Sequence, residues 1–112
     1  MREVVLYCSN MKTPGRTPLT KTQINEALAE LPGWAFRRDR LAKTFTLKSF
    51  RDAMAFMVRL GFEAEQLNHH PELKNVYNRV ELGLNTHDAG GKVTGMDVEL
   101  AKRIEKARAA LA

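Results

Sequence analysis

All three histidines of this 112-residue chain lie in one short stretch, LNHHPELKNVYNRVELGLNTHDAGG, at residues 67–91. His69 and His70 are adjacent and precede Pro71, whereas His87 stands beside an aspartate at the far end of an alternating run. If that run folds back beside the segment after Pro71, His87 returns to the other two and three imidazoles line one pocket. Imidazole titrates near neutral pH and also binds metals, so such a pocket indicates either proton transfer or metal binding.

Metal binding and nucleophilic catalysis are both poorly supported by the pattern. Three histidines can hold zinc with water as the fourth ligand, but adjacent histidines in an extended segment tend to point opposite ways, and no HExxH-type helical pair is present. A nucleophile would need a serine or cysteine beside a histidine. The single cysteine, Cys8, lies in a poorly patterned N-terminal segment, and no serine lies near the histidines. We therefore expect neither a metal nor another cofactor.

General acid–base catalysis agrees better with the pattern. One imidazole can donate a proton while another accepts one, and each such transfer typically contributes about 10²–10⁴-fold in rate. Two facing histidines suit the loss of water from a small substrate, because one protonates the leaving hydroxyl and another handles the departing proton. A structural role stays open: His70 could bond the last carbonyls of a helix, and His87 with Asp88 could form a turn.

Three capping patterns predict the helices that position this stretch. In each, a Ser or Thr is followed three residues later by Gln or Asp, and apolar residues then recur at helical spacing: Thr20 with Gln23, Ser49 with Asp52, and Thr94 with Asp97. The second helix should end at the histidines, because Pro71 disfavours helical geometry at His70. Its expected core stripe is Phe50, Ala53, Met54, Met57, Leu60, Ala64 and Leu67.

Alternating segments predict the strands. Residues 34–36 and 41–47 read as a hairpin, and residues 75–86 as one bent strand or two strands with a turn near Asn78. The order α-β-β-α-β-β-α predicts an α+β single domain, in which a four-stranded antiparallel sheet carries three helices on one face. We expect this domain at residues 19–112. Residues 1–18 are expected to be an N-terminal extension, with at most a short edge strand at residues 4–8.

Composition limits the class of protein. At 44% hydrophobic and 28% charged residues, the chain resembles ordinary globular proteins and can bury a core without staples. The net charge of +5 favours an anionic partner, but the basic residues are scattered, so direct nucleic-acid binding is not expected. No apolar stretch is long enough to span a bilayer. A single cysteine favours a reducing compartment, and we expect a cytoplasmic protein.

The histidine stretch closely resembles the signature of the pterin-4a-carbinolamine dehydratase family. The motif HHP followed at the right distance by TH is specific, and the predicted order of elements also agrees with the family fold. The resemblance covers roughly residues 19–112. The matching residues are Glu65, His69-His70-Pro71, Asn75-Val76-Tyr77-Asn78, Val80, Thr86-His87-Asp88, Gly90-Gly91 and Asp97.

The resemblance implies a reaction and a role for each matching residue. Family members dehydrate 4a-hydroxytetrahydropterins, the products of aromatic amino acid hydroxylases, to quinonoid dihydropterins without a cofactor. His69 and His87 would be the acid–base pair, and His70 would hold and orient the pterin. Glu65 would support the pocket from its helix, and Thr86 and Asp88 would present backbone or side-chain polar groups to the pterin. Asp97 would be a helix cap with a secondary role at the rim. Asn68 and Pro71 complete the set of residues expected to bind the substrate.

The resemblance also implies partners. Family members are usually homodimers or homotetramers built through sheet edges and helices, and a hydroxylase or a regulatory protein is a conceivable second partner. The alternative function is a non-catalytic scaffold, assembly factor or dimerisation cofactor on the same fold. A scaffold should survive the loss of His69 and His87, whereas an enzyme should not.

Overall fold

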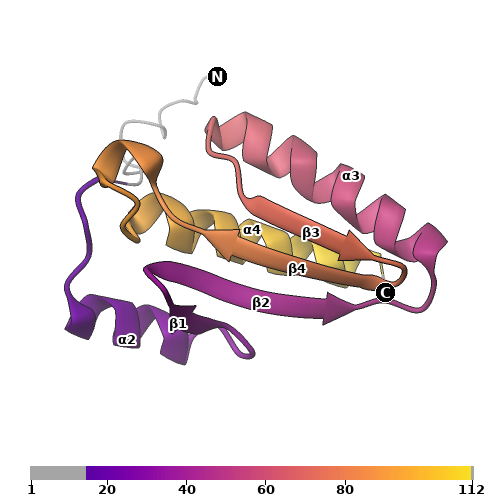
Figure 1. The fold of residues 1–112 in the computed structure, drawn as a ribbon, viewed down its shortest axis with the longest axis horizontal. Helices are drawn as coiled ribbons and strands as arrows, with labels where there is room; N and C mark the ends of the chain where they lie inside the picture. Colours follow the sequence, from indigo (N-terminus) through magenta and orange to yellow (C-terminus); the bar gives the residue numbers. More distant parts are fainter. Residues whose placement is uncertain (1–14, 112) are drawn as a thin grey trace, which may run out of the picture.

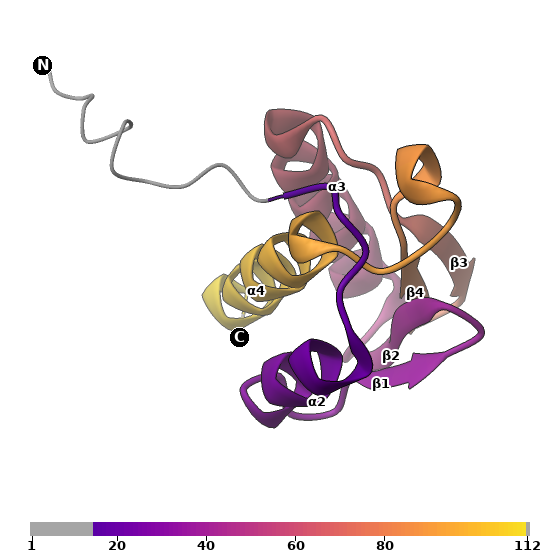
Figure 2. The same cartoon turned by 90° about the vertical axis from the view of Figure 1, so that its left-hand side faces the viewer.

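Four antiparallel strands form one sheet, and three helices cover one of its faces (Figures 1 and 2). The computed structural model describes residues 15–111, so Cys8 and the segment at residues 4–8 lie outside the described residues. The sheet has the strand order β1-β2-β4-β3. The predicted fold class is confirmed. The elements are α2 (Lys21–Ala29), β1 (Ala35–Arg37), β2 (Arg40–Thr46), α3 (Phe50–Leu67), β3 (Glu72–Val76), β4 (Arg79–Leu84), the short 3₁₀ helix η1 (His87–Ala89) and α4 (Gly95–Ala110).

Each helix begins at the residue that its capping pattern predicts. Thr20 and Thr94 form complete capping boxes, and the Ser49 side chain accepts a hydrogen bond from the backbone of Asp52. These side chains satisfy backbone N–H groups that have no partner within the first helical turn. Local sequence therefore fixes where the chain enters each helix.

Two tight turns set the register of the sheet. Arg38 and Asp39 adopt the left-handed conformation in the β1–β2 turn, and Tyr77 adopts it in the turn between β3 and β4. The segment predicted at residues 75–86 thus forms two strands, although the first already begins at Glu72 and the second ends at Leu84. The turn lies beside Asn78, whose side-chain amide donates to the carbonyl of Leu47 at 2.9 Å. Because β3 and β4 run antiparallel with Glu72 opposite Gly83, the end of β4 returns to the end of α3.

The core lies between the sheet and the helices. Alternate residues of β2 and β4 face α3 and α4, and burying each large side chain contributes about 1.5–3 kcal/mol. The largest fully buried apolar side chains are Leu41, Val80, Leu84, Phe56, Leu60, Leu100 and Ile104. This packing holds the sheet firmly against α4 and against α3, which ends two residues before His69.

The predicted core stripe of α3 is partly wrong. Phe50 and Met54 are 46% and 44% exposed, whereas Phe56, which the stripe omitted, is fully buried. The helix is apolar on two faces, so periodicity alone could not tell the buried face from the exposed one.

Among residues 15–111, no helix combines the length and apolarity needed to cross a membrane.

Candidate active site

The end of α3, the start of β3 and η1 meet at one end of the sheet (Figure 1). Asn68 caps α3 in the left-handed conformation, φ 50°, and turns the chain so that His69 and His70 leave the helix axis. Strand β4 runs back beside β3 and delivers His87. The three imidazoles line one cavity of about 370 Å³, as predicted; its lining residues are Arg16, Asn68, His69, His70, Glu72, Asn85, His87 and Asp88.

His69 is held from behind by a buried carboxylate. Its Nε2 lies 2.5 Å from Oδ1 of Asp97, and the two side chains are only 6% and 0% exposed. The other oxygen of Asp97, Oδ2, accepts from the backbone N–H of Thr94 at 2.8 Å and from the hydroxyl of Thr86 at 2.9 Å. With Nε2 engaged, Nδ1 is the ring nitrogen of His69 left for a substrate.

Asp97 caps α4, as the sequence predicts, but its expected place at the rim is wrong. It is fully buried, and its carboxylate joins the helix cap to His69. The capping pattern predicts the helix cap alone. It cannot predict the contact with His69, because His69 lies 28 positions away in the chain. A carboxylate in the first turn of a helix is also stabilised by the helix dipole.

Thr86 lies behind the cavity rather than in its wall, which corrects the expectation that it presents polar groups to a pterin. The residue is 0% exposed. Its hydroxyl contacts Asp97 and Thr94, its N–H donates to the carbonyl of Lys92, and its own carbonyl accepts from Ala89 and Gly91. All its polar groups are thus already engaged.

His70 and His87 form the open part of the site. The Nε2 of His70 lies 3.0 Å from Oε1 of Glu65, but the two side chains are 60% and 78% exposed. His87 is exposed at the start of η1. Glu65 therefore supports His70 from α3, as expected, without itself lining the cavity.

Asn68 and Asp88 line the cavity as expected, whereas Pro71 is half-buried outside its lining. Three lining residues were missed, namely Arg16, Glu72 and Asn85. Glu72 directly follows Pro71, and Asn85 directly precedes Thr86. Their position next to the histidine motif could therefore have indicated that they line the cavity. Arg16 had none, because its segment has no periodic pattern.

Arg16 reaches the cavity from the segment that precedes α2. Its guanidinium donates to the carbonyl of Asn68 at 3.4 Å and lies 3.8 Å from the carboxylate of Asp88. The segment is tied to the start of α4, because Leu19 donates to the carbonyl of Val93 at 2.9 Å. Arg16 thus adds a positive charge between the end of α3 and η1.

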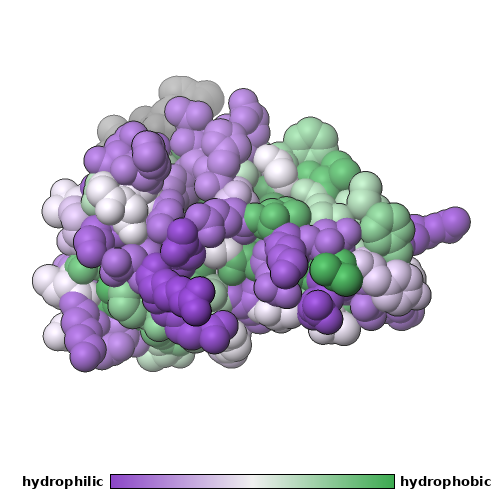
Figure 3. Space-filling view, in the orientation of Figure 1, coloured by the Kyte–Doolittle hydropathy of each residue, from purple (hydrophilic) through white to green (hydrophobic). Residues whose placement is uncertain are grey.

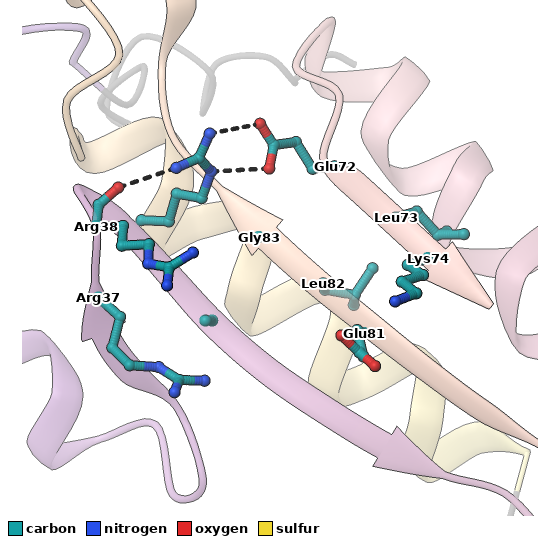
Figure 4. Close-up of a pocket in the computed structure, with 10 residues that line it drawn as sticks. Arg37, Arg38, Glu72, Leu73, Lys74, Glu81, Leu82 and Gly83 are labelled. Carbon is teal, nitrogen blue, oxygen red and sulfur yellow. Dashed lines mark hydrogen bonds and ion pairs between the residues drawn. The ribbon is translucent and has the colours of Figure 1, made fainter. Parts of the chain in front are cut away.

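A second hollow, of about 920 Å³, lies on the helix-free face of the sheet (Figure 4). Across it, Arg40 makes two hydrogen bonds of 2.8 Å to Glu72, which lines both hollows. A Cβ at Gly83 would meet Cδ of Arg40 at 3.1 Å, so glycine leaves room for this contact. The hydrogen bond from Arg40 lowers the pKa of Glu72, and the same contact raises the pKa of Arg40. Glu72 is therefore held in its ionised form beside the histidines.

The arrangement suits proton transfer. One imidazole is buried and oriented by a carboxylate, and a second, exposed imidazole lines the same cavity, so a small molecule between them would meet two groups able to exchange protons. Among residues 15–111, no group of three His, Cys, Asp or Glu side chains is placed to hold a metal ion.

Comparison with known proteins identifies one family. Residues 17–107 match the family model described as pterin 4 alpha carbinolamine dehydratase. A protein of Opitutus terrae that carries the name pterin-4-alpha-carbinolamine dehydratase is 63% identical over 80% of this chain and 93% of its own length. A Rhizobium johnstonii protein of the same name is 48% identical over 81% and 91%. A crystal structure titled transcriptional coactivator/pterin dehydratase, from Brucella melitensis, superposes with a TM-score of 0.79 at 36% identity, covering 82% of this chain and 99% of that one.

Proposed function

Given that this chain belongs to the pterin 4 alpha carbinolamine dehydratase family, we propose that His69 and His87 carry out the proton transfers of its dehydratase reaction. The substrate is a 4a-hydroxytetrahydropterin and the product is the quinonoid dihydropterin. His70 holds and orients the pterin, and the exposed carboxylate of Glu65 contacts its ring at 3.0 Å. The mechanism uses no cofactor.

The reaction needs one proton donor and one proton acceptor. The C4a–O bond breaks, and the hydroxyl takes up a proton and leaves as water. The electron pair of N5 forms the new C4a=N5 double bond, and N5 loses its proton. Because one proton enters and one leaves, two imidazoles in opposite protonation states suffice and finish with their states exchanged.

The observation that carries this proposal is the shared cavity of the three histidines. Its volume of about 370 Å³ falls in the range of small-molecule sites, about 300–1,000 Å³. His69 enters it as a ring fixed by Asp97, whereas His87 enters from η1. An oriented ring on one wall and an accessible ring on another are what a donor–acceptor pair requires.

Steady-state kinetics on a synthetic 4a-hydroxytetrahydropterin test the proposal. His87→Ala and His69→Ala should each lower kcat by about 10²-fold or more, the usual size of an acid–base contribution, and lower kcat/KM with it. Circular dichroism should show that both variants remain folded. Folded variants with near-normal kcat would contradict the proposal and favour a structural or scaffold role for the histidines.

The physiological setting belongs to the same proposal. Dehydration of the carbinolamine would return the pterin cofactor of an aromatic amino acid hydroxylase to its cycle, in the cytoplasm. A coupled assay with a hydroxylase and limiting tetrahydropterin should turn over faster when this protein is added. An unchanged rate would count against recycling while leaving the dehydration itself intact.

We also propose that the chain forms a homo-oligomer through α3. Apolar side chains gather over this helix on the molecular surface (Figure 3), and Met54, Val58 and Phe62 are 44%, 55% and 68% exposed. An antiparallel copy related by a two-fold axis at Val58 would bring Met54 onto Phe62. The same pairing would bring Arg51 onto Glu65, so apolar residues meet apolar residues and opposite charges meet across the face.

Light scattering tests this interface. The wild type should have a mass that is a multiple of the 12.7 kDa monomer, and Val58→Glu should yield the monomer because it sets two carboxylates against each other at the axis. Leu111→Glu, at an exposed apolar residue outside α3, is the control and should leave the mass unchanged. A monomeric wild type at micromolar concentration would exclude the oligomer.

The same face supports the second candidate function, a scaffold or coactivator. Its specific observation is the exposed apolar surface of α3, together with the name transcriptional coactivator carried by the Brucella melitensis protein. Partner binding that persists in His69→Ala and His87→Ala but is lost in Val58→Glu would favour this function. If none of the three variants loses partner binding, the α3 face does not support this second function.

A further inference from the structure

The polar groups behind His69 form a hydrogen-bond chain whose direction follows from counting protons. A threonine hydroxyl has one hydrogen to donate, and a carboxylate has none. The hydroxyl of Thr86 donates to Oδ2 of Asp97, so the 2.6 Å contact between the two threonine hydroxyls requires Thr94 to donate to Thr86. The Thr94 hydroxyl in turn accepts from the backbone N–H of Met96 at 3.2 Å.

The chain therefore runs one way, from the start of α4 to the carboxylate. Oδ2 of Asp97 already accepts from the Thr86 hydroxyl and from the Thr94 N–H, which leaves Oδ1 to receive the proton on Nε2 of His69. Every member except His69 is fully buried or part of the α4 backbone. Little water competes with these bonds, and each bond polarises the next.

We propose that Thr86 is a positioning residue that acts through Asp97 to hold His69 in the tautomer protonated on Nε2. Nδ1 then carries a lone pair toward the cavity, so His69 begins the reaction as the proton acceptor. This inference rests on the proposed acid–base function for its catalytic consequence, but the tautomer itself can be observed without turnover.

Other charged or titratable groups line the same cavity as His69. Glu72 enters from β3, Arg16 from the segment before α2, His87 and Asp88 from η1, and His70 is its neighbour in the chain. All of them lie on the cavity side. Asp97 is the group that contacts the ring from the α4 side, so the buried chain decides which nitrogen carries the proton in the resting state.

Nitrogen-15 NMR of histidine-labelled protein is the direct test, since the chain has three histidines and the His70→Ala and His87→Ala variants assign their signals. In the wild type at neutral pH, the Nδ1 signal of His69 should be that of an unprotonated ring nitrogen. Thr86→Val removes the hydroxyl at nearly constant volume. Thr86→Val should shift the Nδ1 signal of His69 toward that of a mixture of tautomers. It should also lower kcat about tenfold while KM stays within about twofold, a modest loss compared with removal of an acid–base group.

Two matched variants separate positioning from folding. Thr86→Ser keeps the hydroxyl and should restore both the nitrogen signal and kcat. Thr20→Val makes the same substitution at the cap of α2, where the hydroxyl accepts from the backbone of Gln23 away from the cavity, and should leave both unchanged.

A protonated Nδ1 in the wild type would overturn the inference whether or not Thr86→Val folds. A Thr86→Val protein with the wild-type spectrum and kcat would overturn it as well. Normal kcat in His69→Ala would instead refute the proposed function, and the tautomer of His69 would stand as a separate result.

Discussion

His69 and His70 are neighbours in the chain, and each contacts a carboxylate, but the two contacts differ in almost every physical respect. The His69–Asp97 pair is 2.5 Å long and buried, whereas the His70–Glu65 pair is 3.0 Å long with both side chains more than half exposed. Asp97 has two further hydrogen-bond donors from Thr86 and Thr94. Glu65 lies on the surface of α3, where water and salt screen its charge.

Burial therefore gives the same two residue types, a histidine and a carboxylate, different roles. A buried carboxylate with all its donors in place fixes the tautomer and orientation of its histidine, and it cannot be removed without leaving buried groups unpaired. An exposed pair keeps its ring mobile and contributes little. This difference is why we propose proton transfer for His69 and substrate orientation for His70.

The largest contrast should appear in kcat when each carboxylate becomes an amide. Asp97→Asn places an amide N–H₂ where His69 and two donors need an acceptor, so the ring loses its fixed tautomer. We expect kcat to fall by about 10²-fold or more, the scale of an acid–base contribution. Glu65→Gln keeps an acceptor for His70 in exposed surroundings, and kcat should stay within about threefold. Equal losses in the two variants would show that burial does not distinguish the pairs.

Stability should show the next contrast. Asp97→Ala leaves three buried groups without their hydrogen-bond acceptor, namely Nε2 of His69, the hydroxyl of Thr86 and the N–H of Thr94. It also removes half of the α4 capping box. We expect the free energy of unfolding to fall by about 3–5 kcal/mol. Glu65→Ala should change it by no more than about 0.5 kcal/mol. Urea unfolding of both variants measures the difference, and a loss below about 1 kcal/mol for Asp97→Ala would contradict the buried network.

The smallest effect is expected at a third carboxylate, Glu72, which is itself exposed and pairs with a half-buried Arg40. Arg40 lowers the pKa of Glu72, so the pair stabilises the fold above the usual carboxyl range, and the gain disappears as the pH falls through the lowered pKa. Glu72→Gln should thus lower the urea midpoint slightly at pH 7 and not at all in strong acid. Glu26→Gln, on the exposed side of α2, is the control. A difference that grows with acidification would refute this sign.

Local signals predicted most of the fold. The capping pairs at Thr20, Ser49 and Thr94 marked the helix starts because a cap is made within four residues. Alternation marked the strands, since one face of the sheet is buried. Phe50 and Met54 of α3 were assigned to the core in error, because an apolar side chain at helical spacing looks the same whether it meets the sheet or another molecule.

The sequence predicted most of the residues of the candidate site, but not which of them line the cavity and which are buried behind it. The histidine motif marked the cavity, but nothing local could reveal that Asp97 reaches across the fold to His69. Thr86 was different, because it shares the alternation of Val80, Leu82 and Leu84, all buried. That parity was a signal that its side chain faces the helices instead of the substrate.

The most direct test of the division between the two histidines compares His69→Ala with His70→Ala in one steady-state assay. We expect His69→Ala to lower kcat by about 10²-fold or more with little change in KM, and His70→Ala mainly to raise KM while kcat changes little. Two folded variants with the same loss in kcat, or a reversed pattern in which His70→Ala lowers kcat and His69→Ala raises KM, would contradict it.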